Sequence, residues 1–262
     1  DWFNMNGNAK KCVQTCWGRR TAKRLQDHGM DAKNTPVTGA VMMDFLRPEF
    51  AGYFKDKAAL CREFGLDPDK QLHLYISSFG YASMSDAEVA ELSKMAGTDF
   101  TGFARTNRVS MTETLAWFER YLGDHPEVEL VYRRHPSEWN SPALDELAKK
   151  RPNFHVIFAD SVKQWIVAAD SISIWMSTAI AEVYMAGKSC RILRPVPIEH
   201  EYDPVIYKGA QYVTSYEEFA AAMADPQPPF PIAREVIEGY FDPSPRAAYL
   251  RMADLLEEVY KD

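Results

Sequence analysis

The sequence has 262 residues, which is enough for one or two domains with a sizeable core. Its 46% hydrophobic and 26% charged residues are typical of a globular protein and exclude a disordered or collagen-like chain. The net charge of −7 argues against a nucleic-acid partner. No apolar run reaches the ~18 residues that a membrane-spanning helix needs.

The chain opens with Asp1-Trp2-Phe3-Asn4, without an initiator Met or the basic and then apolar pattern of a signal peptide. We therefore expect a processed chain or a segment of a longer protein. Residues 11–29 predict a helix with a basic face that ends at Gly29, and a solvated face is the favoured interpretation of its charges. Residues 35–39 predict a short extended piece, and residues 48–65 predict a helix-rich lead-in.

Two of the four cysteines lie four residues apart, which would place Cys12 and Cys16 on one face of that first helix. They would form either half of a metal site, a redox pair, or two ordinary reduced thiols. No second Cys/His pair lies nearby with zinc-like spacing, so the sequence favours reduced thiols, a reducing compartment and no metal.

From residue 71 onward, apolar segments alternate with capped helices. Strands are predicted at residues 71–78, 128–134, 153–159, 171–175, 190–193 and 211–214. Capping signals begin helices at Ser85, Ser110, Ser141, Ser161 and Ser215, and a further helix is expected over 179–186 before Gly187. A proline-rich connector over 226–231 precedes a last helix that starts at Ser244. Strands separated by helices predict an α/β fold with a doubly wound, Rossmann-like parallel sheet.

Polar residues follow three of the predicted strands at their carboxyl ends, where ligands of such sheets bind. Ser77 and Ser78 follow the first strand, and hydroxyls with a nearby glycine suit an anion, although an ordinary turn is equally compatible. The standard dinucleotide and P-loop glycine patterns are absent.

The second strand ends in Arg133, Arg134, His135 and Pro136. Arginine and histidine side chains donate hydrogen bonds to phosphate, and Pro136 fixes the direction of the chain beyond His135. The alternative is an exposed loop with solvated charges.

The fourth strand is followed by Ser177 and Thr178, which predict the cap of a helix whose free amides face the same edge. Glu182 lies one turn further and suits ribose hydroxyls, the alternative being a plain capped helix with a surface glutamate. Together these groups favour a nucleotide or sugar-phosphate site over a hydrolase site, because the G-x-S-x-G and H-E-x-x-H patterns are absent.

The same residues carry a family resemblance. Residues 159–197 resemble the donor-binding half of a GT-B glycosyltransferase, and His135-Pro136 with Ser177-Thr178 resemble the paired motifs of members that use cytidine nucleotides. Such members include CMP-sialic acid and CMP-Kdo transferases and CDP-glycerol glycerophosphotransferases. Upstream, Trp17-Gly18, Val37-Thr38-Gly39 and Asp44 are similar to the linker of bacterial surface-carbohydrate biosynthesis proteins. The resemblance covers about residues 10–225.

The resemblance implies a domain division of 1–45 (the remnant or end of a GT-B N-terminal domain and its linker), 46–243 (the nucleotide-donor-binding domain) and 244–262 (the C-terminal crossing helix). It implies that His135 contacts the donor phosphate, that Ser177 and Thr178 bind phosphate, and that Glu182 holds the ribose. No tightly bound cofactor is implied. Asp44 and Glu138 are candidates for the catalytic base, with His135 as the third catalytic candidate.

The resulting hypothesis is a transferase that moves a glycosyl or glycerophosphate group from a CMP-sugar or CDP-glycerol donor to a bacterial surface-polysaccharide acceptor, either a glycan or a lipid-linked one. One alternative is a UDP-sugar enzyme of the GT-B type, such as a transferase or a 2-epimerase relative. Another is a non-catalytic donor-domain module of a larger assembly protein. We expect a cytoplasmic location, and the basic segment over 11–24 raises peripheral contact with the inner face of the membrane as an option.

Overall fold

The computed structural model describes residues 7–199, 201–225 and 228–259, with Val259 described by its backbone alone. The opening Asp1-Trp2-Phe3-Asn4, the first two residues of the predicted connector and the end of the predicted last helix lie outside the described residues. The chain splits into two compact units, one formed by Asp1–Tyr53 with Ile232–Asp262 and the other by Phe54–Pro231. The division predicted from the sequence at 45/46 and 243/244 is not tested by these units and stays a prediction.

The larger unit, Phe54–Pro231, is built on a parallel sheet. Its strands are β1 (Gln71–Ile76), β2 (Val128–Arg133), β3 (Phe154–Val156), β4 (Ser171–Ile174), β5 (Arg191–Leu193) and β6 (Tyr212–Val213). Their order is β3-β2-β1-β4-β5-β6, and every neighbouring pair is parallel. The doubly wound, Rossmann-like sheet predicted from the sequence is therefore confirmed.

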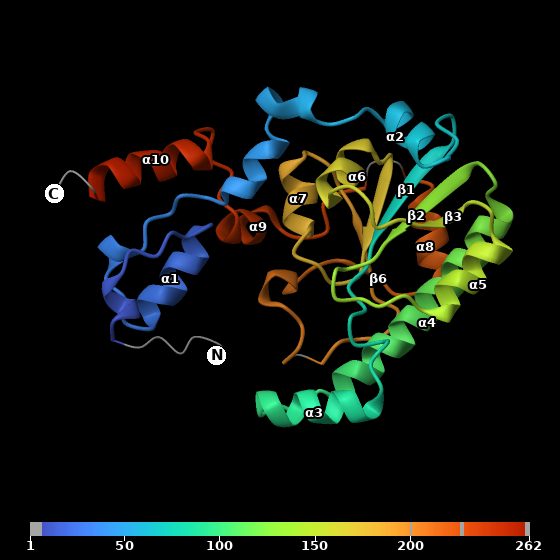
Figure 1. Cartoon of the computed structure of the whole chain (residues 1–262), viewed down its shortest axis with the longest axis horizontal. Helices are drawn as coiled ribbons and strands as arrows, with labels where there is room; N and C mark the ends of the chain where they lie inside the picture. The colour runs from blue at the N-terminus through green and yellow to red at the C-terminus, as the bar shows by residue number, and fades with distance from the viewer. Residues whose placement is uncertain (1–6, 200, 226–227, 260–262) are drawn as a thin grey trace. The chain divides into compact units, whose positions relative to one another are not determined.

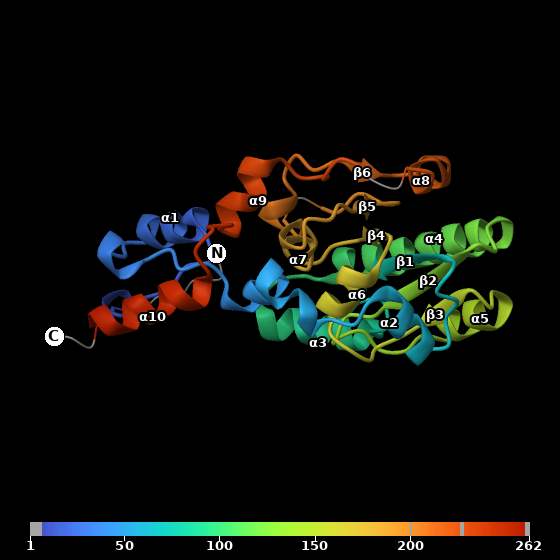
Figure 2. The same ribbon diagram turned by 90° about the horizontal axis from the view of Figure 1, so that it is seen from above.

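Helices cover both faces of this sheet (Figures 1 and 2). They are α2 (Lys57–Glu63), α3 (Asp86–Ala96), α4 (Thr101–Asp124), α5 (Pro142–Lys150), α6 (Val162–Ala168), α7 (Ile180–Met185) and α8 (Tyr216–Met223). Helices α4, α5 and α8 pack on one face, and α2, α6 and α7 pack on the other. Side chains of a strand alternate between the faces, so β1 contributes core residues to both layers.

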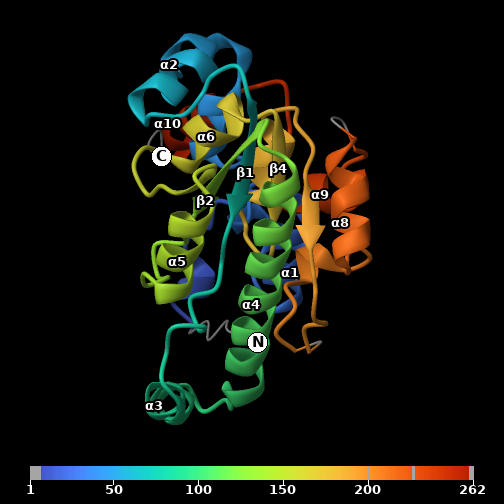
Figure 3. The same cartoon turned by 90° about the vertical axis from the view of Figure 1, so that its right-hand side faces the viewer.

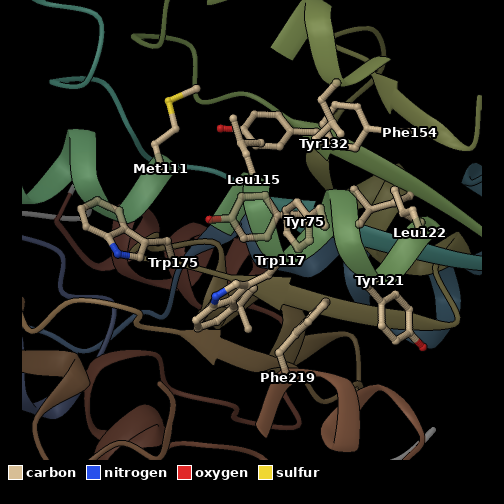
Figure 4. Packing of buried hydrophobic residues seen from close by; sticks show 14 of the residues in the cluster. Tyr75, Met111, Leu115, Trp117, Tyr121, Leu122, Tyr132, Phe154, Trp175 and Phe219 are labelled. Carbon is tan, nitrogen blue, oxygen red and sulfur yellow. The ribbon is translucent and has the colours of Figure 1, made fainter. Parts of the chain in front are cut away.

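Aromatic side chains fill the layer between the sheet and α4 (Figure 4). Tyr75 of β1 meets Phe118 of α4 in a T-shaped arrangement with ring centroids 4.9 Å apart. Phe219 of α8 lies 5.7 Å from Phe118 and 5.3 Å from Tyr121. These rings are buried and hold α4 and α8 on the sheet through burial of apolar surface.

Helix α4 is longer than the sequence predicted, because Ser110 does not begin a helix. The helix runs unbroken from Thr101 to Asp124, and Ser110 is buried in its middle. Phe103, Ala104 and Asn107, in the turns before Ser110, are buried. Packing of these residues keeps the chain helical before Ser110, although the local sequence there resembles a helix start. Figure 3 shows that α3 and the first turns of α4 lie beyond the carboxyl ends of the strands.

The smaller unit joins the two ends of the chain. It contains α1 (Arg19–Asp27), α9 (Arg234–Tyr240), α10 (Ala248–Val259) and short 3-10 helices that include Ala9–Lys11, Ala32–Asn34, Val41–Leu46 and Pro48–Tyr53. Gly18 lies so close to α9 that an added Cβ would come within 2.5 Å of the Gly239 and Tyr240 backbone. The Asp242 amide donates to the Trp17 carbonyl at 2.9 Å.

The helix predicted over 11–29 begins only at Arg19, so that prediction is wrong for residues 11–18. Cys16 instead forms a parallel bridge with Val37, and its amide donates to the Pro36 carbonyl at 2.9 Å. Cys16 is buried whereas Cys12 is exposed, so the two thiols do not share a helix face. The last helix also begins later than predicted, at Ala248 instead of Ser244. Among the described residues, no helix has the length and apolar character needed to cross a bilayer.

Candidate functional site

The strand order places a topological switch point between β1 and β4. From β1 the chain continues to β2 on one side, whereas β4 lies on the other side and is followed by β5. Ligands of doubly wound sheets bind in the crevice outside the carboxyl ends of the strands at such a point. The segments that follow β1, β2 and β4 are those in which the sequence predicted the site.

Two adjoining hollows of about 300 Å³ each lie at this edge and share His135, Ser177 and Thr178. The aromatic hollow is lined by Ser78, Gly80, Tyr81, Phe103, His135, Ser137, Met176, Ser177, Thr178, Pro204, Ile206 and Tyr207. The Glu182 hollow is lined by Ile76, Ser77, Arg133, Arg134, His135, Pro136, Phe158, Val162, Ser177, Thr178, Ala179 and Glu182. Every residue that the sequence predicted to bind the donor lines one of these hollows.

His135 lies exposed on the loop after β2, and its hydrogen bonds define which ring nitrogen carries the proton. Its Nδ1 accepts from the Ser137 amide at 3.1 Å, and the Ser137 Oγ lies 2.7 Å from the same atom. Because an amide nitrogen only donates, this pattern assigns Nδ1 as an acceptor and places the proton of the neutral ring on Nε2. His135 therefore presents a hydrogen-bond donor at the junction of the two hollows.

Glu138 is buried beneath this junction and links the loops that follow β1 and β2. Its Oε2 accepts from Ser77 Oγ at 2.5 Å and from the Phe79 amide at 3.1 Å. Its Oε1 accepts from the Tyr132 hydroxyl at 2.7 Å, and the Ser77 and Tyr132 hydroxyls lie 2.8 Å apart. Burial and the nearby carboxylate raise the pKa of Tyr132, so the phenol stays protonated as a donor. The Glu138 carboxylate thus fixes the loops after β1 and β2 relative to each other.

Arg133 and Arg134 shape the Glu182 hollow in different ways. The Arg133 guanidinium is buried and donates to the Ala159 carbonyl at 2.7 Å and to the Asp160 carbonyl, which fixes the loop between β3 and α6. Burial lowers the pKa of Arg133. Both guanidinium groups lie near the half-exposed ring of Phe158, at 5.6 and 5.7 Å from its centroid. An aromatic face with cationic neighbours therefore borders this hollow.

Ser177 and Thr178 lie in the turn that precedes α7, which begins at Ile180 and thus later than predicted. The Ser177 amide donates to the Tyr207 hydroxyl at 2.8 Å, and that hydroxyl donates back to the Ser177 carbonyl at 2.8 Å. Because this amide already has a partner, the hydroxyl of Ser177 is the group left for a ligand, and it also accepts from the Ala179 amide at 3.2 Å. Thr178 is exposed and lines both hollows.

Glu182 projects from α7 into its hollow and is paired with a cation. Its Oε1 lies 2.5 Å from Lys163 Nζ of α6, and both side chains are mostly buried. Such a pair leaves the second carboxylate oxygen, which suits a ligand hydroxyl donor.

Asp44, the other predicted base, belongs to the smaller unit. Its carboxylate is buried and accepts from the Ala248 amide at 3.0 Å and the Tyr249 amide at 2.8 Å, at the start of α10. These contacts stabilise the helix start. Among the described residues, no group of three or more His, Cys, Asp or Glu side chains is arranged to hold a metal ion.

Sequence reasoning missed several residues that build the site. Ser137 sets the His135 tautomer, Tyr207 holds Ser177, and Lys163 pairs with Glu182. Tyr81 and Phe103 line the aromatic hollow. Ser137 stands two residues from His135 in the predicted loop, whereas Tyr207 ends the 3-10 helix Val205–Tyr207 between β5 and β6, where no sequence motif predicted a site residue.

No protein-family model and no curated protein sequence matches the chain. Solved structures do match. One is a UDP-GlcNAc 2-epimerase from Neisseria meningitidis bound to UDP-GlcNAc, with a TM-score of 0.54, 12% identity, and coverage of 94% of this chain and 60% of that one. Another is the wall teichoic acid polymerase TagF, with a TM-score of 0.59, 13% identity, and coverage of 99% and 64%.

A further TagF structure, soaked with CDPG, has a TM-score of 0.55, 11% identity, and coverage of 100% of this chain and 63% of that one. The chain spans less than two thirds of the length of these structures. At such identities the likeness shows the fold, and the GT-B-like α/β fold expected from the sequence is confirmed.

Proposed function

We propose that the chain binds a nucleotide-activated donor at the β1/β4 switch point and transfers the activated group to an acceptor hydroxyl. The observation that carries the proposal is the meeting of the two hollows at His135, where an Nε2–H donor lies beside the hydroxyls of Ser177 and Thr178. A group of donors at the junction of two pockets suits the phosphates of a molecule whose two ends differ.

The Glu182 hollow suits the nucleoside. Phe158 offers an exposed ring face for a base, with the Arg133 and Arg134 guanidiniums nearby. Glu182 offers a carboxylate oxygen for ribose hydroxyls, and Lys163 neutralises the buried charge. This arrangement leaves the phosphates at His135 and the transferred group in the aromatic hollow.

In the proposed reaction, the bond between the activated group and the nucleotide phosphate breaks as the acceptor oxygen forms its new bond and loses its proton to a base. The leaving phosphate gains negative charge, and a preorganised Nε2–H of His135 stabilises it more in the transition state than in the bound donor. Asp44 and Glu138 remain the predicted candidates for the base. The three hydrogen bonds that Glu138 accepts favour a positioning role for it.

We propose a cytidine nucleotide as the donor, since the order of His135-Pro136 and Ser177-Thr178 is what resembles the cytidine-dependent enzymes. The CDPG-soaked TagF among the structural neighbours supports this donor. The epimerase bound to UDP-GlcNAc supports a UDP-sugar as the second candidate. The proposed acceptor is a surface polysaccharide or its lipid-linked precursor, reached from the cytoplasm at the inner face of the membrane.

The test is nucleotide release from donors. The full chain is incubated with CDP-glycerol, CMP-sialic acid and UDP-GlcNAc, and the free nucleotide is quantified by chromatography with and without crude polysaccharide acceptor. We expect release of CMP, and a loss of about 10–100-fold in rate for His135→Ala, which corresponds to one charge-assisted hydrogen bond of about 1.5–3 kcal/mol. His125→Ala is the matched control, because His125 precedes β2 and therefore lies near the amino ends of the strands, away from the site at their carboxyl ends. Equal release by the wild-type chain and His135→Ala contradicts the proposal.

A further inference from the structure

The aromatic hollow has walls that are held in place before any ligand binds. Tyr81 meets Phe103 in a T-shaped contact at 5.0 Å, and Phe103 stacks on Tyr202 at 5.0 Å. Phe103 also lies parallel to Trp175 at 6.4 Å and is buried. Tyr207 is fixed by its two hydrogen bonds to Ser177. Aromatic rings from the first turn of α4, the loop after β1 and the connection between β5 and β6 thus form one preorganised surface.

The described lining of this hollow is made of apolar, aromatic, hydroxyl and histidine side chains. Among the described residues that line it there is no Lys, Arg, Asp or Glu, and His135 presents its Nε2 as a hydrogen-bond donor. Burial raises the pKa of both Tyr81 and Tyr207, so neither phenol ionises near neutral pH. The polar groups that remain are the hydroxyls of Ser78, Ser137, Ser177 and Thr178, which suit neutral hydroxyl or amide partners.

An ionised group would be poorly accommodated here. A carboxylate placed against Phe103 and Ile206 would lose hydration, and the described lining residues offer no Lys or Arg to pair with it. The C–H face of a sugar ring, by contrast, packs against an aromatic ring and leaves its hydroxyls for the rim.

We propose that the aromatic hollow selects the transferred group, and that this group is uncharged beyond the donor phosphates and presents an apolar face to Tyr81 and Phe103. The inference rests on the proposed function and narrows it. Donors such as CMP-sialic acid, whose sugar carries a carboxylate, are disfavoured, whereas neutral sugars and glycerol are accepted.

The test compares donors that differ in one charge. Calorimetry on the full chain first measures CMP, CDP, UMP and UDP. It then compares UDP-glucose with UDP-glucuronic acid, in which a carboxylate replaces one hydroxymethyl group. We expect the neutral member to bind at least as tightly as the free nucleotide, and the acidic member to bind at least 10-fold more weakly.

A variant with a cation in the hollow should reduce the preference for the neutral donor. Tyr81→Arg places a cation in the hollow and should recover at least 10-fold of the relative affinity for UDP-glucuronic acid. Met95→Arg, on the exposed surface of α3 in the same unit, is the matched control for net charge and should leave the preference unchanged.

The outcomes separate the two proposals. Binding of free nucleotides with equal affinity for the neutral and acidic donors overturns the inference and leaves the proposed function standing. Absence of binding for every nucleotide overturns the proposed function and the inference with it. An acidic donor that binds more tightly than its neutral partner also overturns the inference.

Discussion

Glu138 offers the sharpest test of how the site is held together. In Glu138→Ala the Ser77 and Tyr132 hydroxyls, 2.8 Å apart, keep one hydrogen bond between them, so one hydroxyl hydrogen and the Phe79 amide lose their acceptor in a buried setting. Each stranded donor costs about 1–3 kcal/mol. Removal of the buried methylene costs about 1 kcal/mol more. We therefore expect Glu138→Ala to lower the free energy of unfolding by about 3–7 kcal/mol.

The conservative variant separates positioning from proton transfer. Glu138→Gln keeps a carbonyl acceptor, and the hydroxyls can rotate to accept from its amide, so the expected cost is about 1 kcal/mol. A positioning role predicts that Glu138→Gln weakens nucleotide binding and turnover together. A role as catalytic base predicts lost turnover with unchanged binding.

Urea unfolding, followed by tryptophan fluorescence, measures the stabilities, and Glu146→Ala on the exposed face of α5 is the control. If Glu138→Ala unfolds within about 0.5 kcal/mol of that control, the hydrogen-bond network does not hold the loops as described. If Glu138→Gln binds nucleotide normally and fails only in turnover, the positioning argument is refuted.

Three further predictions follow from buried groups. Burial, with Arg191 adding to it, lowers the pKa of His73 to about 3, so the unfolded chain takes up a proton below about pH 6.5 that the native state does not. Stability should then fall by up to about 1.4 kcal/mol per pH unit between pH 6.5 and 3, and an unchanged acid slope in His73→Gln would contradict this. Asp44→Ala should destabilise the smaller unit by about 0.5–2 kcal/mol through loss of the α10 cap, measured by thermal unfolding, with no change refuting the assignment. Arg133→Lys keeps the charge but loses the carbonyl contacts, so nucleotide affinity should fall several-fold in calorimetry, and wild-type affinity would contradict the role of the β3–α6 loop.

Much of the larger unit was predictable because its signals are local. Apolar strands followed by serine caps identified the order of strands and helices, and the carboxyl-end rule then identified the loops at His135 and Ser177. The start of α4 was mispredicted because Ser110 begins a pattern that usually caps a helix. In the folded chain, burial of Phe103 and Asn107 stabilises helix before Ser110 instead.

The rest depended on contacts between distant residues. Cys16 pairs with Val37 instead of continuing a helix, and no local pattern encodes that pairing. Tyr207 and Lys163 reach Ser177 and Glu182 across 30 and 19 residues of sequence, so only the folded chain reveals them. Glu138 is held by three donors that are far from it or unpatterned in the sequence: Tyr132 on β2, and Ser77 and Phe79 in the loop after β1.

Nucleotide binding by the full chain shows whether the site after β1, β2 and β4 holds a nucleotide donor. Calorimetry with CMP, CDP, UMP, UDP and ADP is run on the wild type, His135→Ala and the control His125→Ala. We expect that a pyrimidine nucleotide binds, that cytidine nucleotides bind most tightly, and that His135→Ala weakens binding about 10-fold or more while His125→Ala does not. Equal binding by wild type and His135→Ala, or binding of none of the five nucleotides, would contradict this expectation.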